Sequence, residues 1–199
     1  MATPLVPATA PSNWNLPNLI TVVRILLAPL FMWLLLADDG ADGGLRWAAA
    51  ALFIVAIATD GIDGAIARKY NLVTDLGKLL DPIADKILTG GALICLSILG
   101  ELPWWVTAVI LLREIGITVF RFVMLRDRVI PASRGGKLKT ILQSVAISLA
   151  LLPLWLFLGD WVNGVNTAAM TVAVILTVAT GIDYLAAAAR DARQKRRSA

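Results

Sequence analysis

The sequence contains no histidine and only one cysteine, Cys95, among its 199 residues. Histidine is the commonest general base near neutral pH and the usual ligand of zinc, copper and non-haem iron, so its absence narrows the available chemistry. A single cysteine cannot form an internal disulfide, and the apolar run around Cys95 predicts a buried structural thiol. Any metal site must therefore rely on oxygen ligands, which favour magnesium, manganese or calcium.

Charge is also scarce, because only 16% of the residues are charged and 58% are hydrophobic. The mean hydropathy is +0.77, and a soluble helical bundle would need many more polar faces. The length fits one domain, and we expect an all-α integral membrane protein with six transmembrane helices. The apolar windows of spanning length lie at about residues 16–37, 45–66, 78–100, 103–125, 138–158 and 164–188.

Three segments follow from these windows. Residues 1–15 lack the basic start and long apolar core of a cleaved signal peptide, and are interpreted as an N-terminal lead-in or interfacial segment. Residues 16–190 form the predicted membrane domain, with Asn18 expected to cap its first helix. Residues 191–199 form a basic tail, which we expect to meet anionic lipid and not nucleic acid.

Lysine and arginine gather in the connections after the second and fourth windows and in the tail. The three opposite connections hold five acids against the single base Arg46. Because basic residues favour the cytoplasmic side of a membrane, both termini are predicted to lie in the cytoplasm.

Four aspartates lie within 26 residues of this apolar chain: Asp60, Asp63, Asp81 and Asp85. Carboxylates near a bilayer are costly and are rarely kept without a use. The spacings i,i+3 and i,i+4 place each pair on one helix face, so two neighbouring helices could hold two divalent ions about 4 Å apart. The alternative is a charge network with Arg68 and Lys86, which would leave acids uncompensated.

The stretch from Asp60 to Asp85 has the pattern D-G-x2-D-G-x2-A-R-x8-G-x3-D-x3-D. This pattern resembles the signature of the CDP-alcohol phosphotransferases at every fixed position. The resemblance implies a six-helix membrane fold, usually a homodimer, with its active site at the cytoplasmic side. It also implies a reaction in which an alcohol attacks the β-phosphorus of a CDP-linked lipid and CMP leaves.

The resemblance further implies roles for individual residues. Two Mg²⁺ ions, with Mn²⁺ as a possible substitute, would bind the four aspartates, and Asp85 would also act as the general base. The residues that would contact the CDP-lipid are Asn18, Thr21, Gly64, Arg68 and Thr74.

A second informative region runs from Arg113 to Gln143. A glycine pair before Lys137 suits anion binding, although a basic loop touching lipid headgroups explains the same residues. The patterns R-E-I-x2-T-x2-R and P-A-S-x2-G-K-x-K-T-x2-Q resemble the bacterial phosphatidylglycerophosphate synthases within the family. That resemblance implies CDP-diacylglycerol as donor, sn-glycerol 3-phosphate as acceptor, and the bacterial inner (cytoplasmic) membrane as location. The candidates for the acceptor phosphate are Arg113, Arg121, Ser133, Lys137 and Lys139.

Two alternatives remain open from the sequence. Another acceptor, such as inositol phosphate or phosphatidylglycerol, would suit the same basic residues. A divalent-cation transporter would use the acids as an ion site, but it would be expected to offer access from both faces. The acids and the basic candidates gather on one side of the predicted topology, which favours an enzyme.

Overall fold

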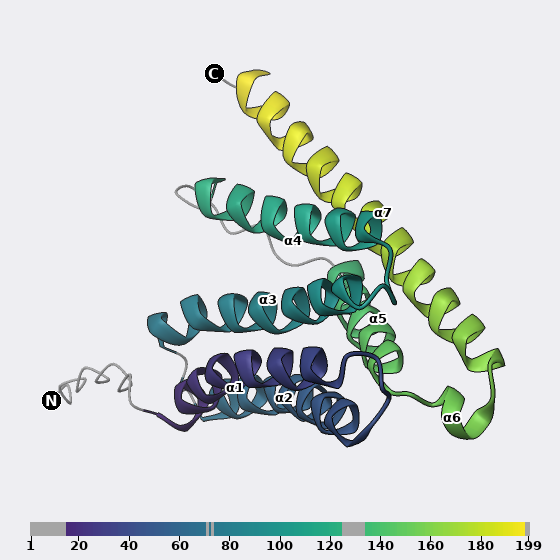
Figure 1. Ribbon diagram of the computed structural model, residues 1–199. Coiled ribbons are helices and arrows are strands. Elements are labelled where there is room, and N and C mark those ends of the chain that lie inside the picture. The colour runs from purple at the N-terminus through teal and green to yellow at the C-terminus, as the bar shows by residue number, and fades with distance from the viewer. Residues whose placement is uncertain (1–14, 71, 73, 125–133, 198–199) are drawn as a thin grey trace, which may run out of the picture.

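The computed structural model describes residues 15–70, 72, 74–124 and 134–197. Within these ranges the side chains of residues 63, 65–68, 75, 78, 121–124, 134–137 and 191–197 are not described. Every regular element in the described ranges is an α-helix (Figure 1), which confirms the predicted all-α class.

Six long helices and one short helix follow one another along the described chain. Their bounds are α1 Leu16–Asp38, α2 Gly44–Lys69, α3 Asp75–Ile98, α4 Trp104–Met124, α5 Arg134–Leu151, α6 Trp155–Leu158 and α7 Trp161–Arg197. The six long helices fall on the six apolar windows, with shifts of several residues at their ends.

The largest shift lies between the fifth and sixth windows. We expected a helix to residue 158, but α5 ends at Leu151 and the separate turn α6 follows. Pro153 has no backbone N–H and disfavours helical geometry at the residue before it, so the helix stops there. Helix α7 then continues to Arg197, through most of the predicted basic tail.

The predicted cap of the first helix is wrong by three residues. Asn15 is the N-cap of α1, and its side chain accepts a hydrogen bond of 2.9 Å from the backbone N–H of Asn18. Asn18 already lies within the helix and is buried. The amide of Asn18 is therefore available for a contact with another helix.

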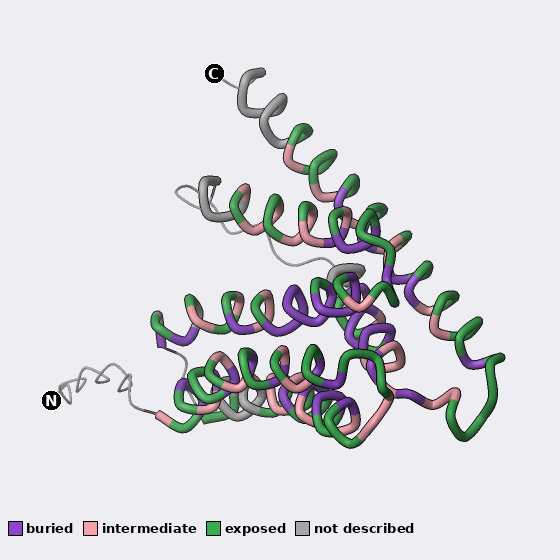
Figure 2. The backbone as a smooth tube through the Cα atoms, in the orientation of Figure 1, coloured by how far each residue is buried: buried purple, intermediate pink, exposed green. Residues whose placement is uncertain are grey.

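Three helices in the described ranges are long and apolar enough to cross a membrane. They are Leu16–Asp38, Gly44–Ile62 and Trp161–Arg190, with mean hydropathies of 2.4, 1.6 and 1.9. Leu138–Leu151 is a shorter apolar helix. Large apolar side chains such as Leu26 and Trp33 on α1 and Ile175 and Ile182 on α7 are exposed, and Figure 2 shows exposed residues along both helices. These features are consistent with an integral membrane protein.

Helix α1 packs against both α2 and α3, while α5 contacts α2, α3 and α7. The buried core runs between these helices and includes Phe31 and Phe53, whose ring centroids lie 5.5 Å apart. Small residues allow close approach: a Cβ on Gly91 of α3 would lie 2.6 Å from the sulfur of Met32 on α1. Cys95 is buried in this core, as predicted.

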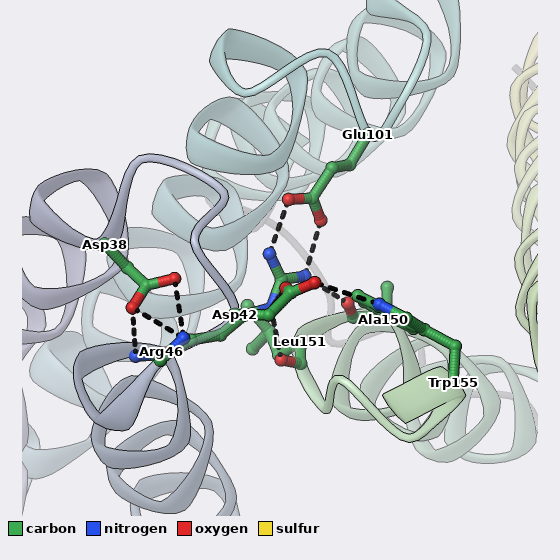
Figure 3. A network of polar contacts seen from close by, with 8 residues as sticks. Asp38, Asp42, Arg46, Glu101, Ala150, Leu151 and Trp155 are labelled. Atoms are coloured by element: carbon green, nitrogen blue, oxygen red, sulfur yellow. Dashed lines mark hydrogen bonds and ion pairs between the residues drawn. The ribbon is translucent and has the colours of Figure 1, made fainter. Parts of the chain in front are cut away.

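A network of polar contacts closes the end of the bundle where α1 turns into α2 and α3 turns into α4 (Figure 3). We call it the Arg46 cluster, and its members are Asp38, Asp42, Arg46, Glu101 and Trp155. The guanidinium of Arg46 is fully buried and donates to both carboxylate oxygens of Glu101 at 2.5 Å. It also donates to the backbone carbonyls of Ala150 at 3.0 Å and Leu151 at 3.1 Å.

The acids of the Arg46 cluster also fix the surrounding turns. Asp38 accepts from the backbone N–H groups of Gly43 and Arg46 at 3.1 and 3.2 Å. Asp42 accepts from the indole of Trp155 at 2.9 Å and lies 3.4 Å from the Arg46 guanidinium. The cluster thus joins the α1–α2 turn, the α3–α4 turn, the end of α5 and α6.

Candidate active site

The predicted acidic residues lie on α2 and α3, whose connection is at the opposite end of the bundle from the α1–α2 turn (Figure 1). Asp60 and Asp63 are on α2, and Asp81 and Asp85 are on α3. The two helices contact each other, and α1 packs against both. The fold therefore brings the two halves of the signature to one region of the molecule.

Helix α1 supplies a polar partner to each half. The guanidinium of Arg24 is 2% exposed and forms an ion pair with Asp60. The hydroxyl of Thr21 is buried and donates to Oδ1 of Asp81 at 2.9 Å. The motif predicted no role for Arg24. A charged residue within an apolar helix is costly, so its presence indicates a buried partner of opposite charge.

The acids keep accessible oxygens despite these partners. The side chain of Asp60 is 44% exposed, Asp81 is exposed, and Asp85 is half-buried. Asp85 interacts electrostatically with Asp60 across the two helices. Carboxylate oxygens that repel one another and face solvent are a donor set suited to a hard divalent cation.

The complete metal cage nevertheless stays a prediction. Among the side chains that the structure describes, no three acids lie close enough together to hold a metal ion. Asp63, one of the four predicted ligands, lies on α2 with its side chain outside that set.

A second contact joins the start of α1 to the start of α3. Thr74 is the N-cap of α3, and its hydroxyl accepts from the backbone N–H of Gly77 at 3.0 Å. The same hydroxyl accepts from the side-chain amide of Asn18 at 2.8 Å. A Cβ on Gly77 would lie only 2.6 Å from Oδ1 of Asn18, so the close packing of Asn18 explains why the signature has a glycine at this position. Two predicted CDP-lipid residues, Asn18 and Thr74, are thus in direct contact.

Two further predicted CDP-lipid residues, Gly64 and Arg68, lie on α2. Gly64 is half-buried on α2, one residue after Asp63. Arg68 is on the last turn of α2, and its side chain is not among those described.

A cluster of charged side chains joins α4, α5 and α7, and we call it the Glu114 cluster. Its members are Arg113, Glu114, Lys139 and Thr180. Oε1 of Glu114 accepts from Arg113 at 2.9 Å and forms an ion pair with Lys139, which is 3% exposed. Arg113 also donates to the hydroxyl of Thr180 at 2.9 Å. The fold therefore brings together two predicted acceptor-phosphate residues that are 26 positions apart.

The side chains of the remaining acceptor candidates lie outside the described set. Arg121 lies on α4 and Lys137 on α5, with side chains outside the described set, and Ser133 falls in a segment that is not described. Within the described part, the carboxyl of Asp85 on α3 interacts electrostatically with Glu114 and Lys139.

The structure thus combines an all-helical bundle, helices long and apolar enough to span a membrane, and an acidic region with a basic cluster beside it. The family model of the CDP-alcohol phosphatidyltransferases matches residues 14–179. The chain belongs to this family.

The curated relatives agree with one another in name. The chain is 48% identical over 177 residues to a "probable phosphatidylglycerophosphate synthase" of Mycobacterium tuberculosis, covering 89% of this chain and 83% of the relative. It is 41% identical over 184 residues to a CDP-diacylglycerol–glycerol-3-phosphate 3-phosphatidyltransferase of Bacillus subtilis, covering 86% and 93%. A Shigella flexneri protein with that name is 35% identical over 190 residues, covering 90% and 97%.

Proposed function

We propose that this protein transfers the phosphatidyl group from CDP-diacylglycerol to sn-glycerol 3-phosphate, giving phosphatidylglycerophosphate and CMP. The family membership and the names of the relatives support this reaction. One structural observation carries it furthest: Asp85 of the acidic region lies within electrostatic range of Lys139 in the basic cluster. A phosphorylated alcohol held by that cluster would have its free hydroxyl near a carboxylate base.

The acidic region would hold the pyrophosphate end of the donor. Asp60, Asp63, Asp81 and Asp85 are the proposed ligands of two divalent ions, Mg²⁺ first and Mn²⁺ as an alternative. When bound, such ions neutralise the charge of the pyrophosphate and of the departing CMP. Arg24 and Thr21 hold two of these carboxylates in place from α1.

Asp85 is the proposed general base. Its carboxylate would accept the proton of the acceptor hydroxyl as the hydroxyl oxygen bonds to the β-phosphorus. The bond between the β-phosphorus and the bridging oxygen then breaks, and CMP leaves with that oxygen. Asn18, Thr21, Gly64, Arg68 and Thr74 would orient the CDP part of the donor, as inferred from the signature.

The acceptor phosphate would be held by basic and hydroxyl side chains on and between α4 and α5. Arg113 and Lys139 already lie together in the Glu114 cluster. Arg121, Ser133 and Lys137 are proposed to complete the site. Arginine and lysine are suited to this task because their donors match phosphate oxygens.

The membrane arrangement is part of the same proposal. Six crossings by the long helices, both termini in the cytoplasm, and a homodimer in the bacterial inner membrane agree with the charge asymmetry and the family resemblance. The basic end of α7 would then lie against the anionic lipid of the inner leaflet.

Purified protein supplied with CDP-diacylglycerol and a set of acceptors tests the proposal. CMP release should require a divalent ion and sn-glycerol 3-phosphate. Activity with inositol phosphate or phosphatidylglycerol alone would contradict the acceptor, and no CMP release with any alcohol would contradict the reaction. Transport of divalent ions into proteoliposomes, with no release of CMP from CDP-diacylglycerol, would instead support the transporter alternative.

A further inference from the structure

Glu114 occupies a position that the predicted chemistry does not use. It lies on α4 between two cations that are both candidates for binding the acceptor phosphate. Both cations contact the same atom, because Arg113 and Lys139 each approach Oε1 of Glu114. One carboxylate oxygen therefore sets where the two cations lie relative to each other.

The burial of this group gives the arrangement its energetic weight. Lys139 is 3% exposed, and the side chains of Glu114 and Arg113 are 14% and 18% exposed. Two buried cations repel each other, and an uncompensated buried charge is strongly unfavourable. Without the carboxylate, Lys139 and Arg113 would separate toward solvent or toward other partners.

The rest of the cluster leaves Arg113 little freedom. Its second terminal nitrogen is bonded to Thr180 on α7. A Cβ on Gly181 would lie 3.2 Å from Cγ of Arg113, so the arginine stem fills the space beside that glycine. Its Nε is buried without a hydrogen-bond partner among the described residues and lies beside Gly181, so packing against α7 also holds the guanidinium in place.

The charge balance also suits a phosphate. One carboxylate and two cations leave the cluster with a surplus of one positive charge, which attracts an anionic phosphate group. The nearby carboxyl of Asp85 interacts with both Glu114 and Lys139. The proposed base and the Glu114 cluster therefore influence each other electrostatically.

We propose that Glu114 is a positioning residue for the acceptor phosphate. It holds Arg113 and Lys139 at a fixed separation at the junction of α4, α5 and α7, so that the phosphate meets two cations that are already oriented. Pre-orientation of this kind lowers the entropic cost of binding and of reaching the reactive geometry. The inference rests on the proposed function, since it assigns a residue to the acceptor site of that reaction.

Steady-state kinetics of the purified full-length protein test this role. Glu114→Gln should raise the KM for sn-glycerol 3-phosphate about tenfold, the effect of losing roughly 1.4 kcal/mol of binding. The KM for CDP-diacylglycerol should change less than about twofold, because the donor binds elsewhere. Glu114→Asp keeps the charge at a shorter reach and should raise the acceptor KM only about threefold.

A double-mutant cycle separates positioning from a general structural role. In a Lys139→Met background, Glu114→Gln should add less than about twofold to the acceptor KM, since its partner is already lost. Asp160→Asn is the matched control, because Asp160 is an exposed acid at the other end of the bundle. It should leave both KM values unchanged.

The outcomes distinguish this inference from the function on which it rests. An active wild type in which both Glu114 variants keep a normal acceptor KM would overturn the role of Glu114 alone. Equal rises in the KM for donor and acceptor would overturn it as well, since that result marks general damage. If Glu114→Gln does not fold, the acceptor KM of Glu114→Asp decides the question. A folded wild type without CMP release would overturn both proposals.

Discussion

Arg46 and Arg113 both have carboxylate partners inside this bundle, yet their surroundings differ. The guanidinium of Arg46 is fully buried, and all three of its nitrogens donate to Glu101 or to backbone carbonyls of α5. Arg113 donates to Glu114 and Thr180, but its buried Nε has no acceptor among the described residues. Every nitrogen of the Arg46 guanidinium thus has an acceptor, whereas Nε of Arg113 has none among the described residues.

The sign of the surplus charge also differs between the two clusters. In the Arg46 cluster three acids surround one base, and each acid holds a turn or a neighbouring helix. In the Glu114 cluster one acid lies between two bases. A buried ion pair by itself therefore does not mark a functional site. We propose that the positive charge surplus of the Glu114 cluster, which is complementary to an anionic ligand, distinguishes it from the Arg46 cluster.

The largest expected effect concerns the acidic region that the Glu114 cluster adjoins. Asp85→Asn removes the proposed base, and general-base catalysis contributes about 10²–10⁴-fold, so turnover should fall by roughly a thousandfold. Binding of CDP-diacylglycerol should remain measurable. Asp183→Asn, the same change at an exposed position on α7, is the control and should keep normal turnover. Normal turnover in Asp85→Asn would contradict the assignment of the base.

Removing Arg46 should lower the stability of the folded protein and leave its catalytic activity unchanged. Arg46→Met leaves Glu101 and Asp42 without their cation, and breaking a buried pair costs about 3–5 kcal/mol. The melting temperature in detergent should fall clearly, while the acceptor KM of the folded protein stays near that of the wild type. Arg190→Met at an exposed position should change neither quantity. A selective rise of the acceptor KM in Arg46→Met would remove the distinction between the two clusters.

The contact between α1 and α3 should give a smaller, donor-specific effect. A Cβ in Gly77→Ala would lie 2.6 Å from Oδ1 of Asn18 and would push that side chain away from Thr74. Overpacking of this kind costs about 1–3 kcal/mol, and the KM for CDP-diacylglycerol should rise more than the KM for the acceptor. Gly116→Ala meets open space and should keep both values. Unchanged donor kinetics in Gly77→Ala would separate this contact from donor binding.

The smallest effect is expected from a single hydrogen bond. Thr21→Val removes the donor to Asp81 while keeping the shape of the side chain, and a typical hydrogen bond contributes about 1 kcal/mol. We expect kcat/KM to fall roughly fivefold. Thr107→Val removes a buried hydroxyl that bonds Ser97 at the far end of α3 and should lower the melting temperature without this kinetic loss. Equal kinetic losses in the two variants would contradict a specific role for Thr21.

Much of the fold was predictable because it depends on local pattern. The apolar windows located the six long helices, and the spacing of the aspartates placed Asp60 on α2 and Asp81 and Asp85 on α3. The end of α5 was missed although Pro153 marks it, because the apolar run continues past the proline. The cap was misplaced because Asn15 and Asn18 both suit that position.

The partners of the charged residues were not predictable in the same way. Arg24 meets Asp60 from 36 positions away, and Arg46 meets the carbonyl of Leu151 from 105 positions away. Such pairs depend on how the helices pack, and hydrophobic periodicity does not encode which polar groups then come together. The role proposed for Glu114 therefore required the three-dimensional arrangement.

We infer that the acidic region and the Glu114 cluster act on one phosphorylated alcohol. The most direct measurement compares CMP release from CDP-diacylglycerol with sn-glycerol 3-phosphate and with glycerol, which has the same hydroxyls and no phosphate. We expect metal-dependent CMP release with sn-glycerol 3-phosphate and a kcat/KM at least about a hundredfold lower with glycerol, since charge-assisted contacts of two cations with the phosphate contribute several kcal/mol. Equal activity with the two acceptors, or none with either, would contradict it.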